Sequence, residues 1–208
     1  MDIDWSHELA DQLDWHWRGQ ARPRLNGLTD DEYLWEPVPG CWTVRPRPAD
    51  GGGPGTGAFT VDFAWPQPTP PPVTTIAWRL AHINVAVLGM RVAGQFGGPA
   101  CSYETYPYPG SAKEALGQLD STYHLWISGV RGLSADDLGR ASGPSEQYYP
   151  DSDAPVAQLV LHITREMLHH LAEIALLRDL YLWAAGSGGT VPPGGAAGSG
   201  GKEPRLNG

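Results

Sequence analysis

Residues 153–183 read DAPVAQLVLHITREMLHHLAEIALLRDLYLW, and this stretch decides the fold. Its apolar side chains return at three- and four-residue steps, which is the period of an α-helix that buries one face. Asp153 and Pro155 are typical of a helix start, because a capping side chain is followed by a proline in the first turn. We therefore expect a long amphipathic helix that runs to about Trp183. Its predicted inner side carries Val156, Val160, Ile163, Met167, Ile174, Arg178 and Tyr181.

The same periodicity predicts three further long helices upstream. They cover residues 2–26, residues from a Thr74 or Thr75 cap to about Phe96, and residues from Ser111 to about Val130. Short helical turns are expected after the capping residues Thr29 and Ser134. Four amphipathic helices without strong strands between them favour an all-α four-helix bundle. The predicted buried stripe of the second helix carries Ile76, Leu80, Ile83, Val87 and Met90.

Glycine and proline are unevenly distributed along the 208 residues. Six of the 27 glycines and nine of the 20 prolines lie in residues 39–73, and nine glycines and three prolines lie in residues 186–208. Within the first group, residues 41–47 and 58–65 are strand-like and flank a glycine-rich turn, which predicts a small β-hairpin. We expect one helical domain over 1–183 with a shaped hairpin insert at 39–73, and a disordered tail at 184–208.

Charge and composition exclude several classes of protein. The net charge of −9 argues against a nucleic-acid binder, which needs a basic face. No apolar run approaches the 18 residues of a membrane span, and the N-terminus lacks the layout of a signal peptide. Cys41 and Cys101 lack CxxC spacing and are typical of reduced cytosolic thiols. We therefore expect a cytoplasmic protein that binds neither nucleic acid nor membrane.

Chemically informative side chains gather in the last long helix. Glu166 and His170 are four residues apart and are neighbours on one face. At about 100° per residue, both fall within the core-facing arc, whereas His162 and His169 fall at its edge. A carboxylate and an imidazole that point into a bundle cost free energy unless something pairs with them.

Two interpretations of this pair are open. The pair can supply two ligands to a divalent metal, and His82, on the inner side of the second helix, can supply the third. Alternatively, the pair forms only a buried polar contact, or binds Arg79 or Arg91.

With these residues in view, the chain resembles the DinB/YfiT-like family of metalloenzymes. The stretch Trp78-Arg79-Leu80-Ala81-His82-Ile83 is similar to the family's helix-two histidine motif. Residues 166–181, EMLHHLAEIALLRDLY, are similar to its helix-four motif, and residues 14–46 resemble the opening of an actinobacterial branch. The resemblance covers about residues 1–183. It implies an up-down-down-up four-helix bundle that is often a homodimer.

The resemblance also implies a metal site. Family members usually hold their metal with one histidine on helix two and two histidines spaced by four on helix four. His82 takes the first of these places, Glu166 the second and His170 the third. A carboxylate is an acceptable ligand for Zn, Ni, Mn or Fe, so the resemblance implies a divalent metal of one of these kinds.

The activity implied by the resemblance is thiol transfer to a small-molecule substrate. A metal-bound low-molecular-weight thiol would attack an electrophile as thiolate, and mycothiol is the thiol expected of an actinobacterial member. His169 or Glu173 would then carry the proton. Two alternatives stay open. One is a non-catalytic stress-response or small-molecule-binding dimer in which the polar side chains form only a buried network. The other is a metal-dependent hydrolase with an activated water.

Overall fold

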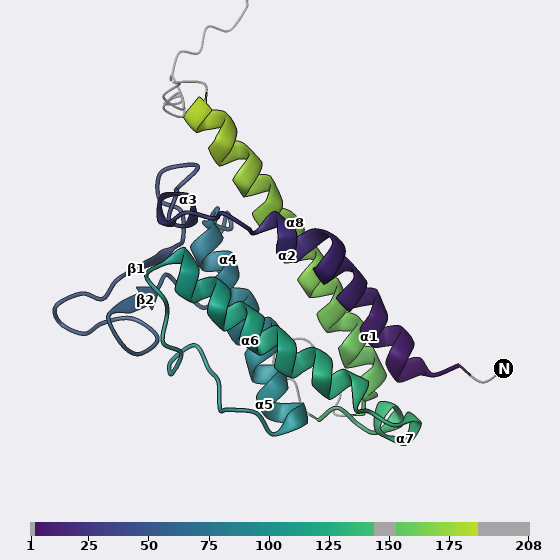
Figure 1. Ribbon diagram of the computed structural model, residues 1–208. Helices are drawn as coiled ribbons and strands as arrows, with labels where there is room; N and C mark the ends of the chain where they lie inside the picture. Colours follow the sequence, from purple (N-terminus) through teal and green to yellow (C-terminus); the bar gives the residue numbers. More distant parts are fainter. Residues whose placement is uncertain (1–2, 144–152, 187–208) are drawn as a thin grey trace, which may run out of the picture.

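A computed structural model describes residues 3–143 and 153–186, and it confirms the predicted helices (Figure 1). Two of the four long helices contain a π-helical turn. The first consists of α1 (Trp5–His16), a π-helical turn (Trp17–Ala21) and α2 (Arg22–Arg24), and the second of α4 (Ile76–His82), a π-helical stretch (Ile83–Gly89) and α5 (Met90–Phe96). The other long helices are α6 (Ala112–Arg131) and α8 (Val156–Gly186), and the short ones are α3 (Asp30–Tyr33) and α7 (Ala135–Gly139).

The long helices form an up-down-down-up bundle. In Figure 1, α1 and α8 run upwards, whereas α4–α5 and α6 run downwards. α1 packs between α6 and α8, and α4–α5 packs between the same two helices on the opposite side. The bundle therefore brings α4, which carries His82, against α8, which carries Glu166 and His170.

The core fills the space between these helices with aliphatic and aromatic side chains. Trp17 of the first helix stacks on Tyr123 of α6, with ring centroids 4.1 Å apart. Burial of such rings contributes a large share of the hydrophobic stabilisation. The largest fully buried side chains include Leu13, Tyr33, Ile76, Leu119, Trp126, Ile163, Met167 and Ile174.

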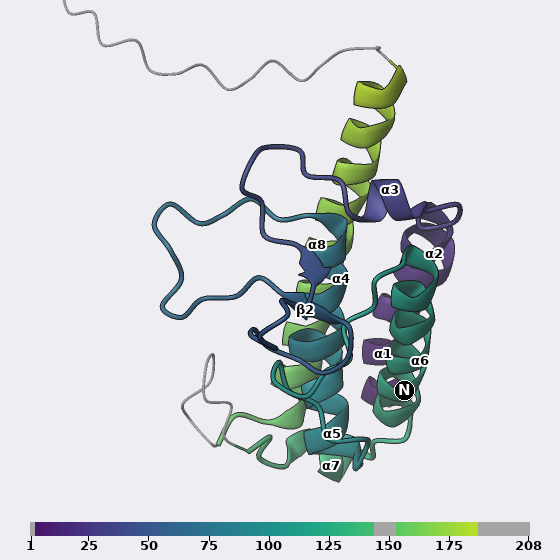
Figure 2. The ribbon, with the colours of Figure 1, turned by 90° about the vertical axis from the view of Figure 1, so that its left-hand side faces the viewer.

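The predicted hairpin is present but shorter than expected. β1 (Val44–Pro46) pairs antiparallel with β2 (Phe59–Val61), with Val44 opposite Val61. Figure 2 shows the insert against the outer side of α4. A two-stranded ribbon is only marginally stable alone, so contacts with the bundle must hold it.

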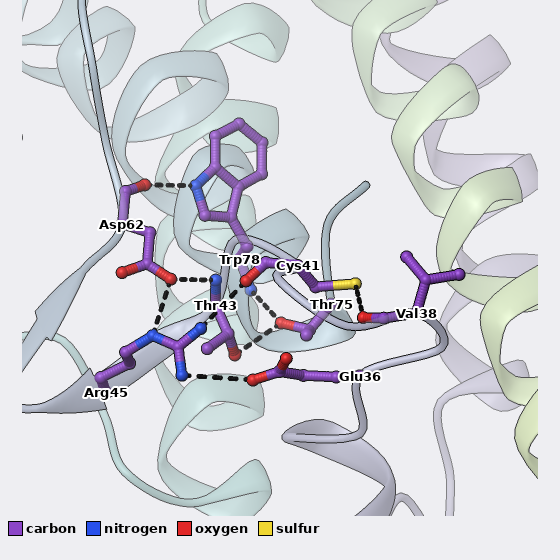
Figure 3. A network of polar contacts seen from close by, with 8 residues as sticks. All are labelled: Glu36, Val38, Cys41, Thr43, Arg45, Asp62, Thr75 and Trp78. Carbon is purple, nitrogen blue, oxygen red and sulfur yellow. Dashed lines mark hydrogen bonds and ion pairs between the residues drawn. The ribbon is translucent and has the colours of Figure 1, made fainter. Parts of the chain in front are cut away.

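Figure 3 shows these contacts. The Asp62 carboxylate accepts hydrogen bonds of 2.9 Å from the Thr43 backbone N–H and from Arg45 Nε. The indole N–H of Trp78, on α4, donates to the Asp62 carbonyl oxygen at 2.8 Å. The hydroxyl of Thr75, the N-cap of α4, donates to the Thr43 hydroxyl at 2.8 Å. The insert is thus fixed to the start of the helix that carries His82.

Three details of the helical prediction are wrong. Met90, expected in the buried stripe, is 40% exposed, because the π-helical stretch before it takes more residues per turn and changes the phase. α8 begins directly after Pro155, at Val156, one residue later than expected. α8 also continues to Gly186, so residues 184–186 of the expected tail are helical, and residues 187–208 lie outside the described part of the chain.

Two expectations from composition can be compared with the described residues. Cys41 and Cys101 are both free thiols, and Cys41 is buried. None of the helices described is both long enough and apolar enough to cross a membrane.

A buried carboxylate on α1 provides a first testable prediction. Asp14 is 5% exposed and accepts hydrogen bonds from the Tyr123 hydroxyl at 2.9 Å and from Arg131 at 2.6 Å, and Arg18 lies 2.9 Å away. Burial alone would raise the pKa of Asp14, but these hydrogen bonds and the two arginine charges outweigh it and lower the pKa. The carboxylate therefore contributes stability above its unfolded pKa of about 4, which is lost as pH falls.

We expect Asp14→Asn to lower the free energy of unfolding at pH 7 by about 1–3 kcal/mol, as for hydrogen bonds to a charged group. The difference from the parent protein should begin to shrink below about pH 4, where Asp14 becomes protonated in the unfolded state while the folded state still holds the carboxylate. Urea unfolding of both proteins across pH 3–7 measures this. A difference that does not change with pH would contradict the role of the charge.

Candidate metal centre

The centre of the candidate site is His170, a buried side chain on the inner face of α8. Its Nδ1 lies 2.7 Å from Glu173 Oε2, one turn further along the same helix. Glu173 also pairs with Arg79 of α4, whose Nε lies 3.1 Å from the same oxygen. A carboxylate at Nδ1 fixes the ring and the tautomer, and leaves the lone pair on Nε2.

Glu166 approaches His170 from the other side. Glu166 Oε2 lies 3.5 Å from His170 Nε2. Two atoms that share a tetrahedral metal at about 2.1 Å lie about 3.4 Å apart. The pair predicted from the four-residue spacing thus has the separation that two ligands of one metal need.

His82, on α4, contacts His170. Its ring meets that of His170 edge to face, with centroids 4.8 Å apart. Its Nδ1 lies 2.8 Å from the Tyr103 hydroxyl, and its ring stacks on Trp78 at 5.3 Å. Both histidines therefore have a hydrogen-bonding partner at Nδ1, which is the usual arrangement behind metal-ligating imidazoles.

A ring of aromatic contacts holds His82 in this position. Trp42 of the insert lies 5.9 Å from Trp78 and 6.4 Å from Phe63, and Phe63 stacks on Tyr103 at 4.9 Å. Tyr103 and Trp78 both contact His82, which closes the ring. The sequence placed the insert next to the helix of His82, but did not identify these aromatic side chains as part of the site.

Both imidazoles are neutral at pH 7. Burial lowers the pKa of His82 to about 3, with further lowering by His170 and Arg79. Burial also lowers the pKa of His170, although Glu173 and Glu166 oppose the shift. Neutral imidazole is the form that binds a metal, so the donor set of two neutral imidazoles and a carboxylate fits a divalent cation.

A second possible grouping shares His170. The ligand atoms of His169, His170 and Glu173 all lie within 4.8 Å of one another, so this His-His-Glu cluster could hold a metal. In this grouping the imidazole of His169 is 65% exposed, with Nε2 3.4 Å from Glu173 Oε1. Among the described residues this is the one such trio. The two candidate ligand sets are therefore His169, His170 and Glu173, and the predicted set of His82, Glu166 and His170, in which Glu166 and His82 each contact His170 but the three ligand atoms do not all lie within that distance.

His162 differs from its predicted position at the edge of the helix face. It is buried, and its Nδ1 accepts a hydrogen bond of 2.7 Å from Arg165 and lies 3.8 Å from Glu166 Oε1. It thus stands next to the site without being a member of either ligand set.

A cleft of about 830 Å³ opens beside these residues. His82, His162 and Glu166 line it together with α5 and the insert. The other lining residues include Trp42, Phe63, Trp65, Trp78, Met90, Arg91, Gln95, Tyr103 and Leu159. A volume of this size accommodates a small organic molecule.

Comparison with known proteins supports the resemblance seen in the motifs. The sequence model described as the DinB superfamily matches residues 12–174, which include the end of α1, the insert, α4, α6 and the part of α8 that carries the site. No curated protein and no solved structure matched the chain. Because the match spans most of the chain and the helical bundle is consistent with it, the protein belongs to the DinB superfamily.

Proposed function

We propose that His82, Glu166 and His170 hold a divalent metal and that the protein is a metal-dependent thiol transferase. The observation that carries the metal site is the 3.5 Å separation of His170 Nε2 and Glu166 Oε2, with the His82 ring in contact with that of His170. Glu166 and His82 also border the cleft. The thiol, mycothiol in our proposal, is supported by the family resemblance and by the small-molecule dimensions of the cleft.

The surrounding residues have positioning roles in this proposal. His170 donates its Nδ1–H to Glu173, and His82 donates its Nδ1–H to the Tyr103 oxygen, so that each Nε2 keeps its lone pair. Arg79 holds Glu173 in place through their 3.1 Å contact. In this arrangement Glu173 orients the His170 imidazole through its carboxylate and is not itself a ligand.

The proposed reaction forms a bond between the sulfur of an intact thiol molecule and an electrophilic carbon of the substrate. When bound, a divalent metal would supply the Lewis acidity that lowers the pKa of the thiol. In the overall reaction a carbon–sulfur bond forms, the bond to the leaving group breaks with its electron pair, and the thiol proton is released. The exposed His169, 3.4 Å from Glu173, is the side chain proposed to pass this proton to water.

The reaction class can be tested with the full chain loaded with Zn²⁺, Ni²⁺, Mn²⁺ or Fe²⁺ in turn. We expect metal-dependent consumption of mycothiol in the presence of 1-chloro-2,4-dinitrobenzene, and no hydrolysis of p-nitrophenyl acetate. Hydrolysis of the ester without thiol would instead support the hydrolase alternative. Inactivity in both assays would contradict thiol transfer, and metal binding would then be judged on its own measurement.

Two residues that do not contact the metal should nevertheless tune its affinity. We expect Glu173→Gln and Tyr103→Phe each to weaken metal binding about 10- to 100-fold, because each removes the group that orients a ligating imidazole. Competition titration with a chromogenic chelator measures the affinity.

Tyr106→Phe is the matched control for these variants. The Tyr106 hydroxyl donates to Gln118 at 2.7 Å and does not touch either histidine. If Tyr106→Phe weakened metal binding as much as Tyr103→Phe does, Tyr103 would have no specific role.

A further inference from the structure

Two side chains hold the His82 ring, and the insert contacts both of them at consecutive residues. The Tyr103 hydroxyl lies 2.8 Å from His82 Nδ1, and the Trp78 ring stacks on the imidazole at 5.3 Å. The indole N–H of Trp78 donates to the Asp62 carbonyl oxygen at 2.8 Å. Phe63, the next residue of the insert, stacks on Tyr103 at 4.9 Å. The position of the chain at Asp62 therefore affects both supports of His82.

The carbonyl of Asp62 is available to Trp78 because the side chain of Asp62 takes its place in the sheet. Val44 stands opposite Val61, so Thr43 and Asp62 form the next pair of the β1–β2 ladder. In a regular antiparallel ladder, a hydrogen-bonded pair exchanges two N–H···O=C bonds. Here the Asp62 N–H donates to the Thr43 carbonyl oxygen at 2.9 Å, but the Thr43 N–H donates to the Asp62 carboxylate, also at 2.9 Å (Figure 3).

The carboxylate of Asp62 thus determines which donor its carbonyl oxygen accepts. With the Thr43 N–H bound by the carboxylate, the carbonyl oxygen points to α4 and accepts from the Trp78 indole (Figure 3). Arg45 Nε donates to the same carboxylate oxygen at 2.9 Å, which adds a charge-assisted hydrogen bond to the arrangement. Asp62 therefore uses one acceptor group within the insert and the other on the helix of His82.

We propose that Asp62 is a positioning residue for the metal centre, which acts on His82 through Trp78 and Tyr103. Without the carboxylate, the Thr43 N–H and the Trp78 indole N–H compete for one carbonyl oxygen. A buried indole that loses its acceptor costs free energy, and its ring no longer gives the imidazole a fixed plane on which to stack. The effect on metal affinity rests on the proposed function, whereas the effect on the His82 ring does not.

The Zn²⁺ affinity of variants of the full chain, measured by competition with a chromogenic chelator, tests this role. We expect Asp62→Ala to weaken binding about tenfold or more, as for other groups that orient a ligating imidazole. Asp62→Asn keeps an acceptor for the Thr43 N–H and loses only the part-exposed ion pair with Arg45, so its loss should be about threefold or less. Trp78→Phe keeps a ring beside His82 but lacks the N–H, and should also weaken binding about tenfold.

Asp50→Ala is the matched control within the insert. The Asp50 carboxylate accepts a hydrogen bond of 3.0 Å from the Gly52 N–H in the glycine-rich turn, and among the described residues it has no hydrogen bond to α4. This variant should keep the Zn²⁺ affinity of the parent protein. Equal weakening by Asp50→Ala, or parental affinity in Asp62→Ala, would overturn the proposal.

The His82 ring gives a second readout, which needs no metal. A ring that donates its Nδ1–H to Tyr103 is held in one tautomer. Long-range proton–nitrogen NMR spectra of the metal-free full chain at pH 7 should show this single tautomer in the parent protein and in Asp50→Ala, and a mixture of both tautomers in Asp62→Ala. Exchange of the Trp78 indole proton with solvent should also be faster in Asp62→Ala.

The two readouts separate this proposal from the proposed function. An unchanged His82 tautomer in Asp62→Ala would overturn the positioning role whether or not Zn²⁺ binds. A parent protein that binds no metal would refute the proposed function, and the tautomer would still report the action of Asp62 on His82. If circular dichroism shows that Asp62→Ala does not fold, Trp78→Phe is measured in its place, and a parental affinity and tautomer in that variant would overturn the proposal.

Discussion

Replacing Arg178 with methionine is expected to lower the free energy of unfolding by about 3–5 kcal/mol. Arg178 lies on α8 and binds Glu32 of α3 through two hydrogen bonds of 2.6 and 3.1 Å. The two side chains are only 10% and 3% exposed. Removal of the guanidinium leaves the Glu32 charge buried without its partner, and this loss is larger than the net contribution of the pair.

Arg178 also connects separate segments of the chain. Its Nη1 donates to the carbonyl oxygens of Arg24, the last residue of the first long helix, and of Asn26, two residues further on. The substitution therefore removes contacts at the end of the first helix as well as at α3. Equilibrium unfolding in urea, followed by circular dichroism, measures the effect.

The neighbouring ion pair between Arg24 and Asp179 provides the matched control. Its side chains are 46% and 57% exposed, so Asp179→Asn should cost less than about 1 kcal/mol. The double variant Glu32→Leu with Arg178→Met should be more stable than Arg178→Met alone, because no buried charge remains. Equal free energies of unfolding for Arg178→Met and Asp179→Asn would show that the buried ion pair contributes no more to stability than the exposed one.

The second large effect is expected at His170. His170→Ala should remove metal binding altogether, since this side chain belongs to both candidate ligand sets. Metal at a hundred times its dissociation constant stabilises a protein by about 2.7 kcal/mol, and this increment should vanish in the variant. Thermal unfolding with and without added Zn²⁺ measures it. His124→Ala, an exposed histidine of α6, should keep the whole increment.

The helices could be predicted because their signals are local. Thr29, Thr75, Ser111 and Ser134 each accept the backbone hydrogen bond expected of an N-cap. The apolar period of residues 156–183 marks the buried face of α8, including the charged but buried Arg178. A helix cap and an apolar stripe depend on residues a few positions apart, which a single sequence displays directly.

The position of Met90 could not be predicted in the same way. A helical wheel assumes 3.6 residues per turn, and the π-helical stretch breaks that assumption between His82 and Met90. No glycine or proline marks the beginning of the stretch, so the sequence there looks like an ordinary helix. The phase error after it is why Met90 was expected in the core and is instead 40% exposed.

The candidate site was predicted only in part. The four-residue spacing and the bundle predict that His82, Glu166 and His170 come together, and the structure places His82 and Glu166 each in contact with His170. Tyr103 lies in a tyrosine-rich loop whose sequence has neither the periodicity of a helix nor that of a strand. Its contact with His82 bridges 21 positions, and such long-range contacts follow from the packing of the whole domain rather than from local pattern.

In the proposed metal site, His82 rather than His169 is the third ligand beside Glu166 and His170. The direct measurement is the metal content of His82→Ala and His169→Ala, each purified from the full chain, saturated with Zn²⁺, desalted and analysed for metal per chain. We predict that His82→Ala retains almost no metal and that His169→Ala retains the stoichiometry of the parent protein. Loss of metal in His169→Ala with retention in His82→Ala would contradict the account and assign the metal to His169, His170 and Glu173.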